Sequence, residues 1–248
     1  MNIAYCFINL AGVYLNRCEI ETALDYFNRA LIIQKEYLPP NHLDIALCLK
    51  NIAGCYQKSL NINELNKVHD YLKEAIKIES KKALHFKHNL DLAISYNNMA
   101  SVYYHKKEFA KALEYNEKSF RMNNGLSTPE VGHFLNNTGL VYKTQYKYDQ
   151  AFDLYSKALK HWQSVLPINH PNGAVVSNNI GCAFASVAAQ DQNDEQANKK
   201  ALEYLESALA ISKETLQFDH TNIAITYYNI VQVYELILTK KKSKLKLT

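Results

Sequence analysis

A short phrase that occurs six times constrains the fold of this chain more than any other feature of its sequence. Each copy begins with Asn, has a small residue two positions later (Val in the last copy) and closes three positions further on with Tyr or Phe. The copies begin at Asn9, Asn51, Asn98, Asn137, Asn179 and Asn229. The closing aromatic residues are separated by 42, 47, 39, 42 and 50 residues. Repetition at about 40 residues predicts an array of similar units stacked along the chain.

A second phrase, in which small residues flank larger ones, follows each of the first five copies. It covers residues 23–30, 71–75, 112–119, 151–158 and 201–208. Both phrases have helical spacing; in the first copy, positions i, i+3, i+4 and i+7 hold Phe7, Leu10, Ala11 and Tyr14. One hairpin cannot bury the apolar faces of both of its helices, so neighbouring hairpins must stack. We therefore predict an all-α fold of about five helical hairpins plus an unpaired helix.

The connecting segments indicate where the hairpins meet. Thr128-Pro129-Glu130 offers an N-cap, a proline for the first helical position and an acid for the first turn. The same junction slot holds His42, His170 and His220, which favours a structural role for these histidines. The extra residues of copies two and five fall at 59–67 and 190–200, and we expect both stretches to be surface connections.

The two phrases together resemble the tetratricopeptide repeat. The linker L-P-I-N-H-P at residues 166–171 and the doubled asparagines resemble, more specifically, the repeats of kinesin light chain. The doublets are Asn97-Asn98, Asn136-Asn137 and Asn178-Asn179. The resemblance implies an α–α superhelix, a tetratricopeptide-repeat solenoid, over residues 1–239. We treat residues 240–248 as a separate basic tail and expect it to be mobile or frayed, because its five lysines repel one another.

The six aligned asparagines, which we call the Asn ladder, suggest a binding surface. Asn9 lies roughly 150° around its helix from the apolar stripe, so it points away from the core of its hairpin. Lys, Glu and Gln are better helix formers than Asn, so a purely solvated face would not retain Asn six times. One interpretation is that the amides bind the backbone of a peptide, as the resemblance also implies; the other is that each amide bonds to the adjacent repeat. The candidate peptide-binding residues are Asn9, Asn51, Asn98, Asn137, Asn179, Asn229, Asn97, Asn136, Asn178 and Lys50.

The sequence has no recognisable catalytic pattern. It contains no glycine-rich phosphate loop, no H-E-x-x-H and no G-x-S-x-G. His85 and His88 have a spacing that suits a metal ion, but no further ligand pair accompanies them. The five cysteines form no C-x-x-C pair and are odd in number, so we expect free thiols. We predict no enzymatic activity, no metal and no cofactor.

The charge is unevenly placed. Five of the 28 basic residues lie in the last nine positions, and without them 23 basic residues face 24 acidic ones. A nucleic-acid-binding protein usually has a basic stripe on its folded surface, so we expect no nucleic-acid partner. A run of about 18 apolar residues, which a membrane span requires, is also absent. We expect a cytoplasmic protein without a membrane partner.

The predicted function is that of a non-catalytic scaffold or adaptor that binds a protein or an extended peptide segment in the concave groove of the array. The resemblance to kinesin light chain implies binding of a cargo or partner protein. The alternative is a repeat module of a larger enzyme or signalling protein whose catalytic domain lies outside this chain.

Overall fold

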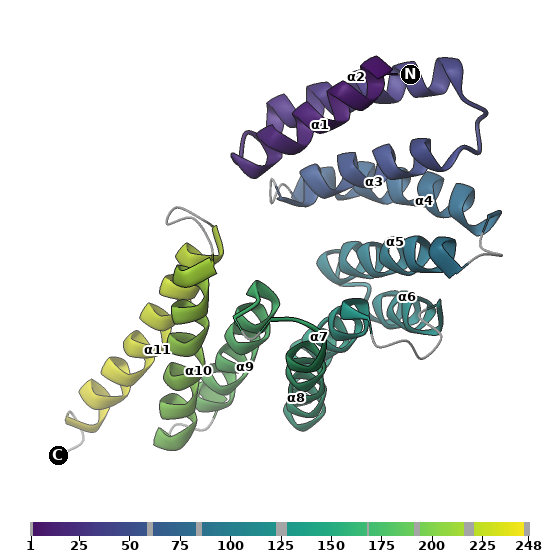
Figure 1. The fold of residues 1–248 in the computed structure, drawn as a ribbon. Helices are drawn as coiled ribbons and strands as arrows, with labels where there is room; N and C mark the ends of the chain where they lie inside the picture. Colours follow the sequence, from purple (N-terminus) through teal and green to yellow (C-terminus); the bar gives the residue numbers. More distant parts are fainter. Residues whose placement is uncertain are drawn as a thin grey trace. The chain divides into compact units, whose positions relative to one another are not determined.

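The computed structural model describes residues 2–58, 62–82, 86–122, 128–167, 169–190, 194–215 and 221–245. This described part consists of eleven α-helices and a short 3-10 helix, and it has no strand (Figure 1). The fold is therefore all-α, as the helical spacing predicted. The chain divides into two units, residues 1–126 and residues 127–248. In both units, the odd-numbered helices carry the first phrase and the even-numbered helices carry the second.

The first unit contains three helical hairpins. Its helices are α1 (Asn2–Asn16), α2 (Ile20–Tyr37), α3 (Leu43–Lys58), α4 (Leu65–Ser80), α5 (Phe86–His105) and α6 (Phe109–Met122), with the 3-10 helix at Ile62–Glu64. Within each hairpin the two helices pack along each other, and α2 packs on α3 as α4 packs on α5. Stacking of successive hairpins is the arrangement that the two apolar phrases require.

The second unit contains two hairpins and a final helix without a second-phrase partner. Its helices are α7 (Pro129–Thr144), α8 (Tyr148–Val165), α9 (Pro171–Gln190), α10 (Glu195–Thr215) and α11 (Thr221–Leu245). Here α8 packs on α9, and α11 packs on both α9 and α10. The prediction of five hairpins plus an unpaired helix is thus confirmed.

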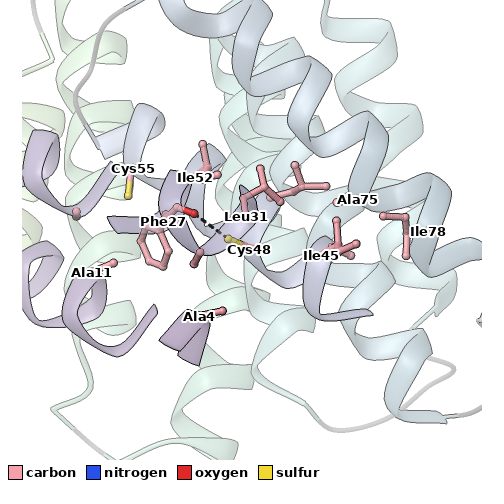
Figure 2. Close-up of a cluster of buried hydrophobic side chains, with 14 residues drawn as sticks. Ala4, Ala11, Phe27, Leu31, Ile45, Cys48, Ile52, Cys55, Ala75 and Ile78 are labelled. Atoms are coloured by element: carbon pink, nitrogen blue, oxygen red, sulfur yellow. Dashed lines mark hydrogen bonds between the residues drawn. The ribbon is translucent and has the colours of Figure 1, made fainter. Parts of the chain in front are cut away.

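Small residues on one helix face larger ones on the next, and this pairing builds the core of the first unit. Figure 2 shows a cluster in which Ala4 and Ala11 of α1 lie near Phe27 of α2, which is 2% exposed. The cluster continues through Ile45 and Ile52 of α3 to α4. Because alanine is small, the two helices can approach closely. The larger side chain then fills the space that remains between them, which gives the dense packing of a protein core.

Within this cluster the Cys48 thiol donates a hydrogen bond to the carbonyl oxygen of Phe27 at 3.3 Å (Figure 2). Burial raises the pKa of the Cys48 thiol to about 12. A thiol with such a pKa stays protonated at neutral pH and reacts poorly. The described residues contain no disulfide.

Three of the turns within hairpins share one backbone conformation. Cys18, Lys107 and Tyr146 each have a φ of 61°, in the left-handed region that non-glycine residues seldom adopt. After each, the next residue donates its N–H across the helix end; for example, the Lys147 N–H bonds to the Tyr142 carbonyl at 3.0 Å. These bonds satisfy carbonyls that the helix end leaves open, which compensates for the strained residue.

The junctions between hairpins follow the sequence prediction. His42 and His170 each accept, at Nδ1, the backbone N–H two residues later at 3.2 Å, and these bonds cap the starts of α3 and α9. Pro129 is the first residue of α7, as predicted, and Thr128 is its N-cap residue. The third histidine of this set, His220, lies outside the described residues, as does His85; the His88 side chain is not described either.

Two stretches differ from the expectation of surface connections. Most of residues 190–200 is helical, because α10 already begins at Glu195, where the Asp194 carboxylate accepts the Ala197 N–H at 2.7 Å. Residues 62–67 form the 3-10 helix and the start of α4. In the described residues, the additional residues of the second and fifth copies therefore lengthen helices.

The last helix continues beyond residue 239. It ends at Leu245, and Lys240 donates from Nζ to the Ala188 carbonyl of α9 at 2.6 Å. Residues 246–248 of the predicted tail lie outside the described residues. None of the helices that the structure describes has a stretch long and apolar enough to cross a bilayer.

Candidate functional site

All members of the Asn ladder lie on odd-numbered helices. Asn9 of α1 is exposed, and the other five ladder residues are partly buried. Among the preceding residues of the doublets, Asn97 and Asn178 are also partly buried, whereas Asn136 is 5% exposed. The amides therefore sit at the boundary between helix packing and solvent, where both interpretations of the ladder are open.

In the second unit, the ladder connects neighbouring odd-numbered helices. Asn179 of α9 donates from Nδ2 to the Oδ1 of Asn136 on α7 at 2.8 Å. Asn229 of α11 makes the equivalent bond to the Oδ1 of Asn178 on α9 at 3.0 Å. Asn136 in turn donates to the Oδ1 of Asn137 at 3.3 Å. In this unit, Asn179 and Asn229 therefore bond to the adjacent repeat, which is the second of the two interpretations of the ladder.

In the first unit, the ladder amides are not used in this way. Among the described residues, the side-chain amides of Asn9, Asn51 and Asn98 have no hydrogen-bond partner. Asn51 and Asn98 are nevertheless partly buried, so water solvates them less freely than Asn9. The main-chain carbonyl of Asn98 accepts from Gln57 Nε2 at 3.4 Å, which links α5 to α3. The two amides thus keep both donor and acceptor available on a supported surface.

Lys50, which precedes Asn51, is held inside the first unit. It is 8% exposed and its Nζ lies 2.7 Å from Glu79 of α4 and 3.2 Å from Asp91 of α5. Ser95 of α5 donates to the second oxygen of Glu79 at 2.6 Å. This cluster, which we call the Lys50 network, joins three helices and neutralises the buried ammonium. Lys50 therefore positions α5 beside the ladder, and its charge is satisfied within the chain.

A pocket lies next to the ladder in the second unit. It has a volume of about 210 Å³ and lies between α9, α10 and α11. Its lining residues are Ala174, Val175, Asn178, Asn179, Ser212, Asn222, Ile225 and Thr226. Val175 and Ile225 are exposed hydrophobic residues. The pocket combines apolar walls with amide groups, the mixture typical of sites that accept a ligand side chain.

His133 links α7 to α9 one turn before Asn137. Its Nε2 lies 3.4 Å from Nδ2 of Asn172, and its ring packs edge-on against Trp162 with centroids 5.1 Å apart. Burial, with a smaller contribution from His170, holds the pKa of His133 below its ordinary value of 6.5, and Glu130 opposes this shift. The native structure therefore favours the neutral ring.

We expect the melting temperature to fall as the pH is lowered from about 7 to about 5. The folded pKa of His133 is depressed, so the unfolded chain binds more protons in this window and unfolding is favoured as the pH drops. Burial lowers the pKa of His105 in the first unit as well, so each unit contributes. Thermal unfolding followed by Trp162 fluorescence reports on the second unit. His133→Gln should make the melting temperature of the second unit depend less on pH. If the melting temperature still changed with pH as steeply as in the unmodified protein, the role given to His133 would be contradicted.

Comparison with known proteins decides the family. A sequence model described as tetratricopeptide repeat matches residues 1–81, and a second model with that description matches residues 92–124 and 132–172. These matches cover more than half of the chain. The chain belongs to the tetratricopeptide repeat family. No curated protein sequence matches it.

Solved structures share the tetratricopeptide repeat fold. BtubC (BKLC) from P. vanneervenii is 21% identical with a TM-score of 0.65, and the match covers 91% of this chain and 87% of that one. A putative kinesin light chain of Podosopora anserina with nearly identical TPR-like repeats is 18% identical with a TM-score of 0.59, covering 86% and 97%. The apo form of RapI is 18% identical with a TM-score of 0.65, covering 96% and 65%. The fold is thus that of kinesin light chain-like tetratricopeptide repeats.

Within this tetratricopeptide repeat array, sequence reasoning missed the partners of Lys50. Glu79, Asp91 and Ser95 belong to other helices, and none of them stands in either repeated phrase. One signal was available, because Lys50 occupies the place where three later copies have the first Asn of a doublet. The structure places Lys50 in this internal network, and the described residues contain no cluster of three potential metal ligands.

Proposed function

We propose that this tetratricopeptide repeat protein is a non-catalytic scaffold that binds an extended segment of another protein on its odd-numbered helices. In the first unit, Asn51 and Asn98 are the residues that we expect to bind the ligand backbone. The observation that carries this proposal is that their amides are partly buried and have no hydrogen-bond partner among the described residues. An extended peptide has N–H and C=O groups along its length, and each Asn amide can pair with one of each.

In the second unit, we propose that ladder amides serve mainly to join repeats. Asn179 and Asn229 already donate to Asn136 and Asn178, so they have less to offer a peptide backbone. The neighbouring pocket of about 210 Å³ is then where a ligand side chain would enter.

Two double variants separate these roles. Asn51→Ala with Asn98→Ala should weaken peptide binding by roughly one to two decades, because each lost hydrogen bond is worth on the order of 1 kcal/mol. Its melting temperature should hold or rise, because Ala is the better helix former. Asn179→Ala with Asn229→Ala should instead lower the melting temperature, because it removes the two hydrogen bonds that ladder residues make to the preceding odd-numbered helix.

The measurement uses a peptide selected from a random display library by the unmodified protein. Its affinity is determined by calorimetry for the unmodified protein and both double variants, and thermal unfolding is followed on the same samples. An unchanged affinity in the Asn51/Asn98 variant, together with a clear loss of thermal stability, would refute the binding role. A third double variant, Asn98→Ala with Asn137→Ala, changes one ladder residue in each unit. Its loss of affinity should lie between those of the other two double variants.

A further inference from the structure

The fifth copy lacks two large residues that the other copies have on their first-phrase helix. Six positions before the ladder Asn, the other five copies have Ile3, Ile45, Leu92, Val131 and Ile223. Two positions before it, they have Phe7, Leu49, Tyr96, Leu135 and Tyr227. In the fifth copy these places hold Gly173 and Ser177. The substitutions lie one helical turn apart, so they remove volume from the same face of α9.

In the second and third copies these positions fill space between helices, whereas Ile3 of the first copy and Tyr227 of the last are exposed. Leu49 is fully buried, and Ile45 and Leu92 are 1% and 3% exposed. In the first and third copies the aromatic residue at the second position packs against the even-numbered helix of its own hairpin. The ring of Phe7 lies 5.7 Å from that of Tyr26, and the ring of Tyr96 lies 5.9 Å from that of Tyr115.

In the fifth copy the missing volume is a pocket, which we call the α8–α10 pocket. It has a volume of about 300 Å³. A Cβ atom added at Gly173 would meet nothing within 4 Å, so the space beside Gly173 is open, whereas Ser177 on the same helix face is buried. The lining residues are Leu159, Trp162, Gln163, Pro167, His170, Gly173, Ser177, Glu203, Tyr204, Ser207 and Ile211. They belong to α8, α9, α10 and the linker before α9, all within the second unit.

The α8–α10 pocket is separate from the ladder. At about 100° per residue, Gly173 and Ser177 lie roughly 120–160° around α9 from Asn179. A ligand of this pocket would therefore leave the ladder face open. Its walls include the apolar groups of Trp162, Tyr204 and Ile211, and the exposed Glu203 and Gln163 add hydrogen-bonding groups.

We propose that the α8–α10 pocket binds the side chain of a tyrosine in a partner polypeptide. At the position of Gly173 the other copies have an aliphatic residue, and at the position of Ser177 three of them have an aromatic residue. A ring inserted by a partner would therefore occupy the space that an aromatic side chain of the repeat occupies in those copies. A cavity of about 150 Å³ already accepts benzene, so this volume suffices for a phenol ring. The Glu203 carboxylate can accept the phenol O–H. This proposal does not depend on the ladder or its ligand.

The test uses N-acetyl-tyrosinamide as the probe and Trp162 as the reporter. Trp162 is the single tryptophan of the chain and lines the pocket, so fluorescence excited beyond the tyrosine absorption band reports on this site. We expect saturable binding with a dissociation constant of roughly 1 mM, as a small fragment allows. N-acetyl-phenylalaninamide should bind several-fold more weakly, because it lacks the O–H group. Stronger binding of N-acetyl-lysinamide, or no saturable response to the tyrosine probe, would overturn the proposal.

Filling the pocket provides the decisive variant. Gly173→Ile with Ser177→Leu recreates the pair Ile45 and Leu49 of the second copy and should abolish probe binding. Gly173→Leu alone, whose Cβ enters open space, serves if the double variant does not fold, and it should weaken binding at least about tenfold. Gly12→Ala also replaces an unobstructed helical glycine, but in α1, and should leave binding unchanged. Probe binding that survives filling would refute the site.

The carboxylate is tested separately. Glu203→Gln should remove the preference for the tyrosine probe over the phenylalanine probe. Glu206→Gln changes an exposed carboxylate of the same helix that does not line the pocket, and it should retain the preference. An equal preference in both variants would exclude Glu203 as the acceptor. Because peptide binding at the ladder is measured with a different ligand and on different residues, failure here leaves the scaffold proposal standing.

Discussion

Replacing Lys50 by Met should lower the free energy of unfolding by about 3–5 kcal/mol, because the substitution leaves a buried carboxylate without its counterion. Glu79 is 1% exposed, and the Lys50 ammonium lies 2.7 Å from it. The hydroxyl of Ser95 alone cannot neutralise that charge. Urea denaturation followed by circular dichroism measures the change, which for a unit of this size is equivalent to a fall in melting temperature of roughly 10 °C or more.

A matched ion pair in the same unit provides the control. Lys35 of α2 and Glu74 of α4 also join two hairpins, with a separation of 2.9 Å, but both side chains are nearly half exposed. Glu74→Gln should therefore cost less than about 1 kcal/mol. Lys50→Met combined with Glu79→Leu should recover most of the stability, because both charges are removed together. A loss for Lys50→Met as small as that for Glu74→Gln would contradict the prediction.

The hairpins were predictable because their signals are local. The spacing of Phe7, Leu10 and Tyr14 fixes one apolar face on α1, and Pro129 marks the start of α7, whichever repeats lie beside them. The histidine caps at His42 and His170 were also visible as a shared junction slot. Such features depend on a few consecutive residues, so they can be predicted without knowledge of how the helices pack.

The state of each ladder amide was not predictable in this way, because it depends on a residue about one repeat earlier. Asn179 finds its acceptor at Asn136, 43 residues away. The position equivalent to Asn136 is Ile8 in the first copy and Lys50 in the second. Ile8 offers no side-chain acceptor, and Lys50 is engaged with carboxylates. The residue to inspect is the one that directly precedes the ladder Asn of the previous copy. Where that residue is Asn, the amide can bond to the adjacent repeat; where it is Ile8 or Lys50, the amide stays available.

Size matching between helices is a second feature that single phrases do not reveal. The small position of the first phrase is Gly139 on α7, and a Cβ added there would lie 2.7 Å from the ring of Tyr155 on α8. Tyr155 is fully buried, so its ring cannot move into solvent. The glycine is therefore fixed by the large residue opposite, whereas the second copy combines the larger Ala53 with the smaller Leu72.

Gly139→Leu should consequently lower the free energy of unfolding by about 2–3 kcal/mol, because the added side chain overpacks the α7–α8 contact. Gly12→Leu in α1, where an added Cβ meets nothing within 4 Å, should instead raise it by roughly 0.5–1 kcal/mol through helix propensity. Denaturant unfolding of both variants measures the difference, with Trp162 of α8 as a reporter beside the altered contact.

The pair found in the second copy provides the rescue. Tyr155→Leu alone should leave a cavity against Gly139, and Gly139→Ala alone should crowd the Tyr155 ring. Combined, they recreate the pairing of Ala53 with Leu72, so the double variant should be more stable than the sum of the single effects by about 1–2 kcal/mol. The four proteins of this cycle are compared by denaturant unfolding. Strictly additive effects would show that Gly139 and Tyr155 are not matched in size.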